Sequence, residues 1–214
     1  MIDRVWIFDL DNTLHNATPH IFPHINRSMT AYLQHHLKLE EPAANSMRID
    51  YWQRYGATLR GMMKHHATDP EHFLWHTHQF PALSQMILRE PRLRHVLKKL
   101  PGKKIIFSNA PQHYAHAILK MMRIDDCFHD VFAIEHTRYQ PKPQQYGFMR
   151  LLQKYRLQPA RCVMVEDSVE NLSTAKQLGM RTVWVSSTSR VPAYVDVKIT
   201  NVLQLPRVLS QFNH

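Results

Sequence analysis

The sequence predicts an α/β fold, in which a doubly wound parallel sheet carries a helical domain inserted after its first strand. Short apolar runs that end in polar residues recur along most of the chain, and helical patterns separate the later runs. The runs lack alternation of polar and apolar residues, which is typical of strands buried on both faces of a parallel sheet. One long stretch after the first run contains no such strand and is expected to be helical.

Six strands are expected from these apolar runs, the last of them from a weaker signal. In order, the runs cover residues 5–11, 104–110, 130–136, 162–168, 182–187 and 196–200. Helical patterns follow at 113–123, 143–155 and 168–180. The third contains Gly179 near its end, and glycine commonly ends a helix.

The helical block interrupts this rhythm between the first two strands. Its helix-like segments cover 26–39, 47–66 and 70–80, and prolines stand between them. We therefore expect two domains. A catalytic core is formed by residues 1–16 and 92–214, and residues 17–91 form a helical cap.

Size, composition and charge restrict the function classes. The 214 residues include 44% hydrophobic and 21% charged residues, as in ordinary globular proteins. No apolar run is long enough for a membrane span, and the N-terminus is interpreted as a strand rather than a secretory signal. Two cysteines are too few for a disulfide framework, so a cytoplasmic location is expected.

The formal net charge of +10 suggests an anionic partner. The basic residues are spread along the chain without a recognised binding motif, so no nucleic-acid partner is expected. Sixteen histidines are present, and His72 and His76 share a spacing that can bind a metal on one helix face. Because no cysteine and no HExxH pattern accompany them, solvated or hydrogen-bonded histidines are favoured over a zinc site.

Two carboxylates follow the first expected strand. Asp9 and Asp11 are two positions apart, so both side chains project to the same side of an extended chain. A cation or a shared proton must offset their repulsion. One carboxylate can attack phosphorus while the other acts as general acid and base. A turn with acidic caps is the structural alternative.

Polar residues also follow the second strand and precede the 143–155 helix. Ser108 and Asn109 can donate hydrogen bonds to a phosphate oxygen, or they can cap a helix. Lys142 stands between two prolines that stiffen the backbone around one cation. An ammonium group held in this way can bind phosphate and neutralise a carboxylate, whereas a solvated lysine is the ordinary alternative.

Glu166 and Asp167 end the fourth strand, and Asn171 follows one helical turn later. Carboxylates at a strand end can hold Mg²⁺, a hard cation that prefers oxygen ligands. An acidic helix N-terminus is the alternative. Ligands of open α/β sheets bind beyond the carboxyl ends of the strands, and four such sites in succession are not explained by capping alone.

The stretches DLDNT, FSNA, PKP and VEDSVEN resemble the four motifs of the haloacid dehalogenase-like hydrolase superfamily. They stand in the same order as in that superfamily and cover nearly the whole chain. The resemblance implies a Rossmann-like core with the helical insert as a cap over the active site. It also implies that Asp9 forms an aspartyl-phosphate and that Asp11 protonates the leaving alcohol and then activates water.

The same resemblance implies that Ser108, Asn109 and Lys142 bind the phosphoryl group. It further implies a Mg²⁺ cofactor bound by Asp9, Asp11 through its main-chain carbonyl, and Asp167, with Glu166 or Asn171 nearby. The dehalogenases resembled here lack an acid at position 11, so Asp11 favours phosphoryl transfer.

Within the insert, residues 47–63 contain a YxxYGxTLxG-like pattern that is similar to the pyrimidine 5′-nucleotidase-like branch. Tyr51 and Tyr55 share one face of a helix and could stack on a base or belong to the core of the cap. Arg48 and Arg54 are further candidates for contacts with the substrate.

The expected activity is therefore Mg²⁺-dependent hydrolysis of a small-molecule phosphate monoester, with pyrimidine nucleoside 5′-monophosphates as the first choice. A phosphatase for sugar phosphates or other small metabolites is an alternative, since the fold does not determine the substrate. A phosphomutase of the β-phosphoglucomutase kind, or a regulatory protein with a vestigial site, are others. The sequence is compatible with a monomer but does not determine the oligomeric state.

Overall fold

The computed structural model describes residues 4–212 and confirms the predicted α/β fold. Six parallel strands form one sheet with the order β3-β2-β1-β4-β5-β6. The strands are β1 (Val5–Phe8), β2 (Lys103–Phe107), β3 (Asp130–Phe132), β4 (Cys162–Glu166), β5 (Arg181–Val185) and β6 (Val197–Ile199).

Helices connect the strands and cover both faces of the sheet. They are α1 (Ile21–Leu37), α2 (Glu41–Tyr55), α3 (Thr58–His66), α4 (Pro70–Thr77), α5 (Leu83–Met86), α6 (Pro91–Lys99), α7 (Gln112–Met121), α8 (Gln145–Tyr155), α9 (Val169–Gln177) and α10 (Leu205–Val208). Short 3-10 turns are Asp125–Cys127, Ile134–Thr137, Pro159–Arg161, Val202–Gln204 and Leu209–Phe212. None of the helices in this described part of the chain is long and apolar enough to cross a membrane.

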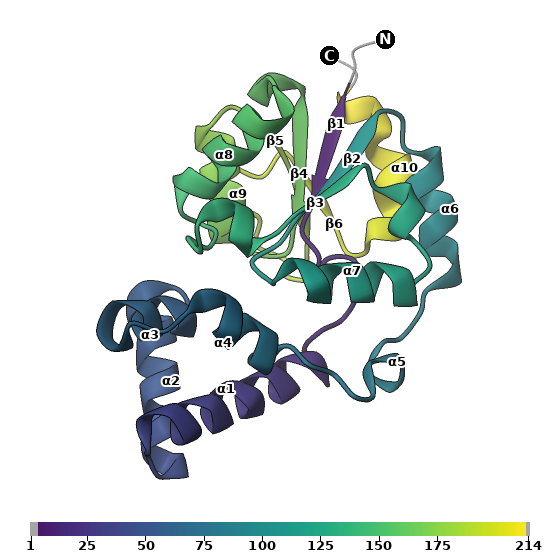
Figure 1. Cartoon of the computed structure of the whole chain (residues 1–214). Coiled ribbons are helices and arrows are strands. Elements are labelled where there is room, and N and C mark those ends of the chain that lie inside the picture. The colour runs from purple at the N-terminus through teal and green to yellow at the C-terminus, as the bar shows by residue number, and fades with distance from the viewer. Residues whose placement is uncertain (1–3, 213–214) are drawn as a thin grey trace.

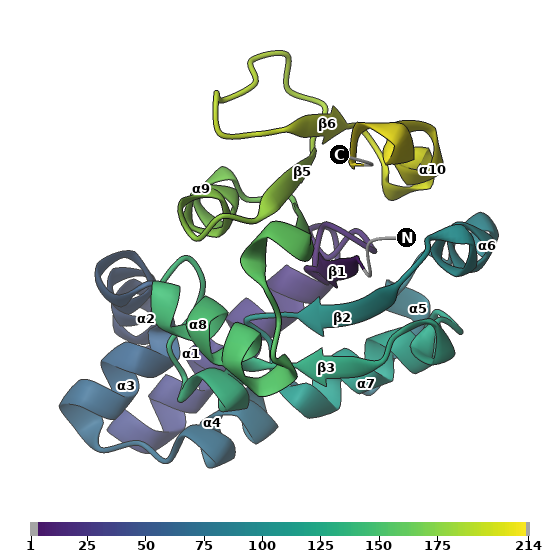
Figure 2. The same cartoon turned by 90° about the horizontal axis from the view of Figure 1, so that it is seen from above.

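Alternate residues of each central strand point into two hydrophobic clusters. In β1, Trp6 and Phe8 belong to one cluster, and Val5 and Ile7 belong to the other. Helices α6, α7 and α10 contribute to the first cluster, and α8 and α9 contribute to the second. The sheet is therefore covered on both faces, and its central strands are buried (Figure 2).

Helices α1 to α4 form a helical unit that lies beyond the carboxyl ends of the strands (Figure 1). This unit has its own hydrophobic cluster, in which Leu33, Met62 and Phe73 are fully buried. The predicted helical segment 47–66 is divided into α2 and α3 at Gly56. Gly56 has a φ of 78° and donates its N–H to Trp52 O, a left-handed end that glycine adopts readily.

The two connections between the helical unit and the sheet run beside each other. Ile21 in α1 and Leu83 in α5 both belong to the first hydrophobic cluster of the sheet. His24 Nε2, in the first turns of α1, is hydrogen-bonded to Gln79 O of the leaving connection at 2.7 Å. The division into domains at residues 17 and 91 remains a prediction.

The expected strand at 130–136 is shorter in the structure. Strand β3 ends at Phe132, and Ile134–Thr137 form a 3-10 turn. β3 lies at the edge of the sheet and pairs with β2 alone, so its ladder stops where Ser108 N donates to Phe132 O. The apolar character of the remaining residues reflects burial in a turn, which the sequence pattern does not distinguish from burial in a strand.

Candidate active site at the carboxyl ends of the strands

The strand order brings three of the predicted site residues to one edge of the sheet. β1 lies between β2 and β4, with Phe8 in register with Ile106 and with Val165. Asp9, Ser108 and Glu166 follow these positions by one or two residues. Parallel strands end at the same edge, so polar residues just after β1, after β2 and at the end of β4 are brought together there.

Lys142 reaches this edge from the loop before α8. Its Nζ donates to Asp9 Oδ1 at 2.8 Å, to Glu166 Oε2 at 2.7 Å and to Phe107 O at 2.8 Å. These three bonds use all the donors of the ammonium group. The side chains of Lys142 and Glu166 are each 1% exposed, and that of Asp9 is 9% exposed, so the charges are removed from water.

Burial and crowding of like charge change the proton affinities of this cluster. Burial, followed by repulsion from Glu166, raises the pKa of Asp9 to about 7 even though Lys142 opposes the change. Burial likewise raises the pKa of Glu166 to about 7. Burial lowers the pKa of Lys142, but Asp9 and Glu166 together outweigh it and hold that pKa above its usual range. The cluster therefore has more negative than positive charge when both acids are ionised.

A third carboxylate completes an oxygen-rich group. Carboxylate oxygens of Asp9, Glu166 and Asp167 all lie within 4.8 Å of one another. Burial raises the pKa of Asp167 as well. Three acids beside one ammonium leave an excess of negative charge, and hard oxygen donors are the ligands that Mg²⁺ prefers. The donor set of this group therefore fits the Mg²⁺ cofactor expected from the sequence.

Asp11 lies in the tight loop after β1 and is held by two side chains. Tyr114 donates its hydroxyl to Asp11 Oδ1 at 2.5 Å, and His15 Nε2 lies 2.9 Å from the same oxygen. Asn12, with a φ of 64°, turns the loop and donates its N–H to His15 O. Asparagine tolerates this left-handed conformation better than most residues. These contacts hold the side chain of Asp11 within the loop that follows Asp9.

Ser108 and Asn109 both form hydrogen bonds with other residues of the loops after the strands. Ser108 is 1% exposed, and its Oγ accepts the N–H of Ala110. Asn109 holds the backbone of Lys142 through two bonds: its Oδ1 accepts Lys142 N at 2.7 Å, and its Nδ2 donates to Lys142 O at 3.2 Å. Phosphate binding by either residue remains a prediction, and the geometry gives Asn109 a role in positioning Lys142.

The family model for haloacid dehalogenase-like hydrolases matches residues 4–179. The chain belongs to this family. Asp9, Asp11, Ser108, Lys142 and Asp167 all lie within the matched residues.

Two curated proteins and one solved structure illustrate the relatives of this haloacid dehalogenase-like hydrolase. "Phosphate metabolism protein 8" of Saccharomyces cerevisiae is 23% identical over 193 residues, which are 83% of this chain and 60% of that protein. A phosphoglycolate phosphatase of Pseudomonas putida is 22% identical over 195 residues, 85% of this chain and 69% of that protein. A HAD phosphatase from Thermococcus onnurineus has a TM-score of 0.69 at 20% identity and covers 97% of this chain and 98% of its own, which shows the shared fold.

The predicted substrate residues of the insert lie on α2 with partners of their own. Arg48 donates to Asn45 Oδ1 and to Asn26 Oδ1, which joins α2 to α1. Tyr51 is 9% exposed, and its hydroxyl is bonded to His66 Nε2 at 2.8 Å. Base contact by these residues remains a prediction, and the bonds of Arg48 and Tyr51 within the helical unit support a structural role for them.

Tyr55 is the less buried tyrosine of the pair. Its hydroxyl is bonded to His65 Nε2 at 2.7 Å, and the ammonium of Lys64 lies 5.0 Å from its ring centroid. Arg54, also considered from the sequence, is paired with Asp50 on the exposed surface of α2.

Three features of this hydrolase were not predicted from the sequence. Glu166 is a direct partner of Lys142, Tyr114 is a direct partner of Asp11, and Arg60 of α3 donates to Gln144 Oε1 at 2.7 Å. The last contact joins the helical unit to the residue that follows the PKP stretch. Tyr114 belongs to an ordinary apolar helix stripe, so no sequence signal distinguishes it from core residues.

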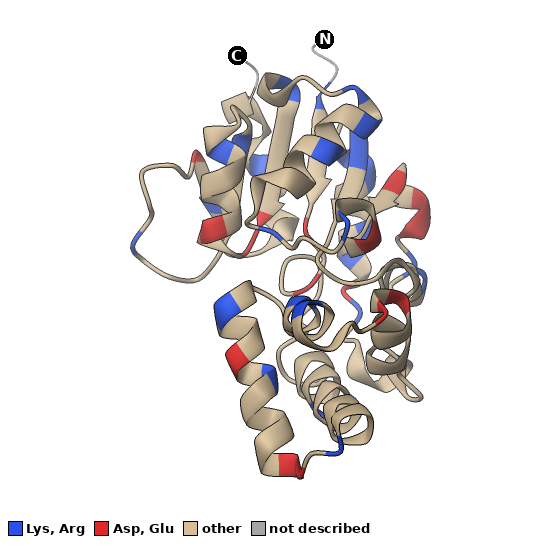
Figure 3. Cartoon of the chain, turned by 60° about the vertical axis from the view of Figure 1, so that its left-hand side comes forward, with Lys and Arg blue, Asp and Glu red and all other residues tan. Residues whose placement is uncertain are grey.

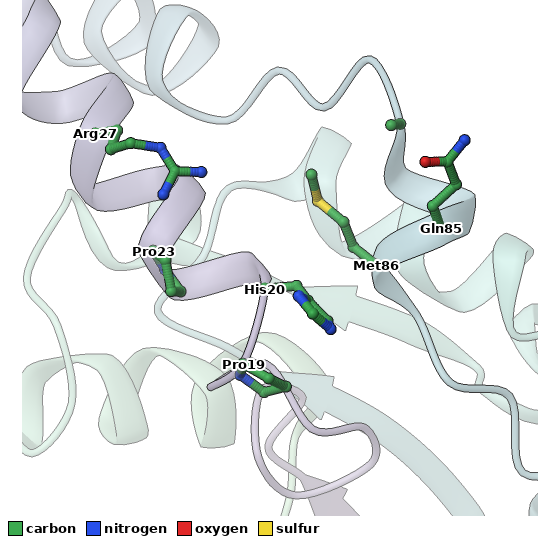
Figure 4. A pocket seen from close by; sticks show the side chains of 7 residues that line it. Pro19, His20, Pro23, Arg27, Gln85 and Met86 are labelled. Atoms are coloured by element: carbon green, nitrogen blue, oxygen red, sulfur yellow. The ribbon is translucent and has the colours of Figure 1, made fainter.

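One cavity is lined by residues outside the acidic cluster. A cavity of about 330 Å³ lies between the start of α1 and α5 and is lined by Pro19, His20, Pro23, Arg27, Ala82, Gln85 and Met86 (Figure 4). None of these residues belongs to the predicted site. Lysine and arginine are distributed over both the sheet region and the helical unit, interspersed with acids (Figure 3).

Proposed function

We propose that this chain hydrolyses phosphate monoesters through an aspartyl-phosphate formed on Asp9. The observation that carries the proposal is the buried contact of Asp9 with Lys142, next to the carboxylates of Glu166 and Asp167. A carboxylate nucleophile needs nearby positive charge to bring a phosphate dianion to it. Lys142 supplies one such charge, and the acid-rich group supplies ligands for another.

In the first step a carboxylate oxygen of Asp9 attacks phosphorus and forms the new P–O bond. The bond from phosphorus to the ester oxygen breaks, and Asp11 in its acid form donates the proton that this oxygen needs to leave as an alcohol. Lys142 lies beside the nucleophile and stabilises the charge on the transferring phosphoryl oxygens.

In the second step Asp11, now a carboxylate, takes a proton from water as the water oxygen attacks phosphorus. The bond between Asp9 and phosphorus breaks, inorganic phosphate leaves, and Asp11 is again in its acid form. Asp9, Asp167, Glu166 and the main-chain carbonyl of Asp11 are the groups that would hold Mg²⁺. When bound there, the ion would offset the negative charge of the carboxylates and of the phosphoryl group.

Pyrimidine nucleoside 5′-monophosphates are the first substrates that we propose, on the basis of the Tyr-rich pattern at residues 47–63. Tyr55 is the better candidate for a base contact, because Tyr51 is more deeply buried. Phosphoglycolate is the second candidate, because the relative from Pseudomonas putida bears the name phosphoglycolate phosphatase. Arg60, which joins the helical unit to Gln144, offers a cation for a second anionic group of such a substrate.

The test is phosphate release from UMP, CMP, dUMP, AMP, phosphoglycolate and several sugar phosphates, each with and without Mg²⁺. Faster turnover of the pyrimidine nucleotides than of AMP and the other esters supports the first substrate. Equal rates on all, or a preference for AMP, would exclude it. Turnover that needs a bisphosphate activator and releases no phosphate would indicate a phosphomutase instead.

Asp9→Asn tests the nucleophile with a nearly isosteric change. Activity should fall by at least about 10³-fold, and acid-quenched protein should no longer carry a phosphoryl group. Asp125→Asn is the matched control, since Asp125 is an exposed acid outside this cluster. Substantial turnover by Asp9→Asn would disprove the covalent route.

A further inference from the structure

Tyr114 connects Asp11 to the segment that leaves the helical unit. It is 1% exposed, projects from α7, and donates its hydroxyl to Asp11 Oδ1 at 2.5 Å. Its ring centroid lies 5.3 Å from that of Phe80 and 5.9 Å from that of His78. The same side chain therefore contacts a site residue with its polar end and the connecting segment with its apolar body.

The connecting segment is itself tied to the start of the helical unit. The ring of Phe80 lies 4.7 Å from that of His24, and His24 Nε2 is bonded to Gln79 O at 2.7 Å. The segment that leaves the helical unit is therefore packed against the first turns of α1, and Tyr114 packs against Phe80 of that segment. Displacement of the helical unit would act on the ring of Tyr114 through Phe80.

At Asp11, both bonds of the surrounding side chains meet on one oxygen. Oδ1 accepts from Tyr114 and also lies 2.9 Å from His15 Nε2. Two contacts to Oδ1 restrict the orientation of the carboxyl group, and Oδ2 is then the oxygen that we expect to meet a reacting oxygen. Positional control of this kind is what proton transfer requires, because a general acid must lie within hydrogen-bond reach of the atom it protonates.

We infer that Tyr114 is a positioning residue that aims the carboxyl group of Asp11 at the leaving oxygen and makes this orientation depend on the connection at Phe80. This inference rests on the proposed function, in which Asp11 protonates the leaving alcohol. A purely structural tyrosine in the core would stabilise the fold without regard to the leaving group of the substrate. The two roles can therefore be separated by kinetics.

The experiment compares Tyr114→Phe with the wild type on an alkyl phosphate ester and on p-nitrophenyl phosphate. The nitrophenolate leaves without a proton, whereas an alcohol needs one. kcat/KM reports the steps up to departure of the leaving group, so it is insensitive to the later hydrolysis of the aspartyl-phosphate. We expect kcat/KM to fall about 10- to 100-fold for the alkyl ester and less than about 3-fold for p-nitrophenyl phosphate.

Tyr155→Phe is the matched control. Tyr155 also donates its hydroxyl to an aspartate, Asp130 Oδ2 at 2.7 Å, but Asp130 begins β3, whereas Asp9 follows the opposite end of the parallel strand β1. Loss of that bond should leave the ratio of the two kcat/KM values unchanged. An equal fall on both substrates for Tyr114→Phe, or no fall on either, would overturn the inference.

A double-mutant cycle gives an independent test. If Tyr114 acts through Asp11, adding Tyr114→Phe to Asp11→Asn should cause no further loss on the alkyl ester. A full additional loss would show that Tyr114 acts elsewhere.

If Tyr114→Phe does not fold, Phe80→Leu keeps an apolar contact without the ring and should shift the same ratio in the same direction. An unchanged ratio in folded Phe80→Leu would overturn the coupling to the connection.

Failure of the proposed function is distinguishable from failure of this inference. If the wild-type protein hydrolyses neither ester, both the proposed function and this inference are disproved. If the wild-type protein hydrolyses both esters and the ratio of the two kcat/KM values is the same for Tyr114→Phe and Tyr155→Phe, only the inference is disproved.

Discussion

Lys142 Nζ lies 2.8 Å from Asp9 Oδ1 although the two residues are 133 positions apart in the chain. Asn109 fixes the backbone of Lys142 through two hydrogen bonds, and Glu166 accepts a second bond from the same ammonium. Asp9, the proposed nucleophile, therefore pairs with the ammonium group of Lys142. Asn109 fixes the backbone of this lysine, and Glu166 binds its ammonium group. This arrangement and its electrostatic consequences lead to three predictions, and the packing around Gly61 leads to a fourth.

Lys142→Met should lower kcat/KM by about 100-fold or more, because the transferring phosphoryl group loses its nearest cation. It should also destabilise the fold by about 3 kcal/mol near pH 8, since two buried carboxylates lose their partner. Enzyme kinetics and urea denaturation measure the two effects.

Lys176→Met is the control for Lys142→Met. Lys176 forms an ion pair with Asp196 at 2.5 Å, but its side chain is 36% exposed. The loss of stability should stay near 1 kcal/mol or below, with unchanged activity. Equal effects of the two substitutions would contradict the special role of Lys142.

Asp9→Asn should become progressively more stable than the wild type as the pH rises, when no divalent cation is present. The pKa of Asp9 is raised from its ordinary value near 3.8 to about 7, chiefly by burial. Between these values the folded state binds a proton that the unfolded state has released, so wild-type stability falls with rising pH. Asparagine carries no such proton, so the difference should grow from about pH 4 to pH 7 and then level off.

Thermal unfolding of Asp9→Asn and wild-type protein across this pH range measures the difference. Asp125→Asn should run parallel to the wild type, because Asp125 is exposed. A difference between Asp9→Asn and wild type that stays constant with pH would show that the proton affinity of Asp9 is ordinary in the folded state.

Asp167→Asn should weaken Mg²⁺ binding by about 10-fold or more, because it removes one carboxylate of the oxygen-rich group. Mg²⁺ should raise the thermal midpoint of the wild-type protein, since a ligand of the folded state stabilises it. The variant should need a higher Mg²⁺ concentration for the same rise.

Asp130→Asn is the comparison for Asp167→Asn. Asp130 is bonded to Tyr155 and Lys154 and lies outside the oxygen-rich group. The thermal midpoint of Asp130→Asn should rise with Mg²⁺ concentration as that of the wild-type protein does. If the thermal midpoint of the wild-type protein does not change with Mg²⁺ concentration, this would argue against a metal site at Asp9, Glu166 and Asp167.

Gly61→Ala should destabilise the helical unit by about 1–3 kcal/mol. A Cβ at Gly61 would lie 2.2 Å from Cγ of Tyr51, so the tyrosine ring would have to move. Gly147→Ala is a milder change in another helix, since its Cβ would lie 3.1 Å from Thr137 Cγ2. Denaturation of the two variants should rank Gly61→Ala as the less stable, and the reverse order would show that Tyr51 is free to move.

Local patterns of the sequence predict much of the fold. Apolar runs without alternation indicate strands that are buried on both faces, and all six expected strands are present. Gly179 follows α9 with a φ of 89°, as its place in the pattern predicted. The pattern fails where burial is not specific for a strand, as at 130–136, and where one glycine divides a helical pattern, as at Gly56.

The candidate site is predictable only in part. Acids and polar residues at strand ends are visible in the sequence, because parallel strands end at one edge of a sheet whatever their order. The partner of each side chain is not visible, since it depends on distances across the sheet and between helices. Asn109 hydrogen-bonds to the backbone of Lys142, and Tyr51 hydrogen-bonds to His66, and neither partner can be read from the sequence.

Residue types and their spacing by themselves determined the α/β class, the helical insert and the set of polar groups after the strands. Only the tertiary structure decided that Lys142 is shared by Asp9 and Glu166, and that Tyr114 and His15 meet on one oxygen of Asp11. The physical reason is the range of the forces involved. Secondary structure follows from neighbours along the chain, whereas hydrogen bonds and the pKa values of buried acids depend on atoms within a few ångströms that any part of the chain can supply.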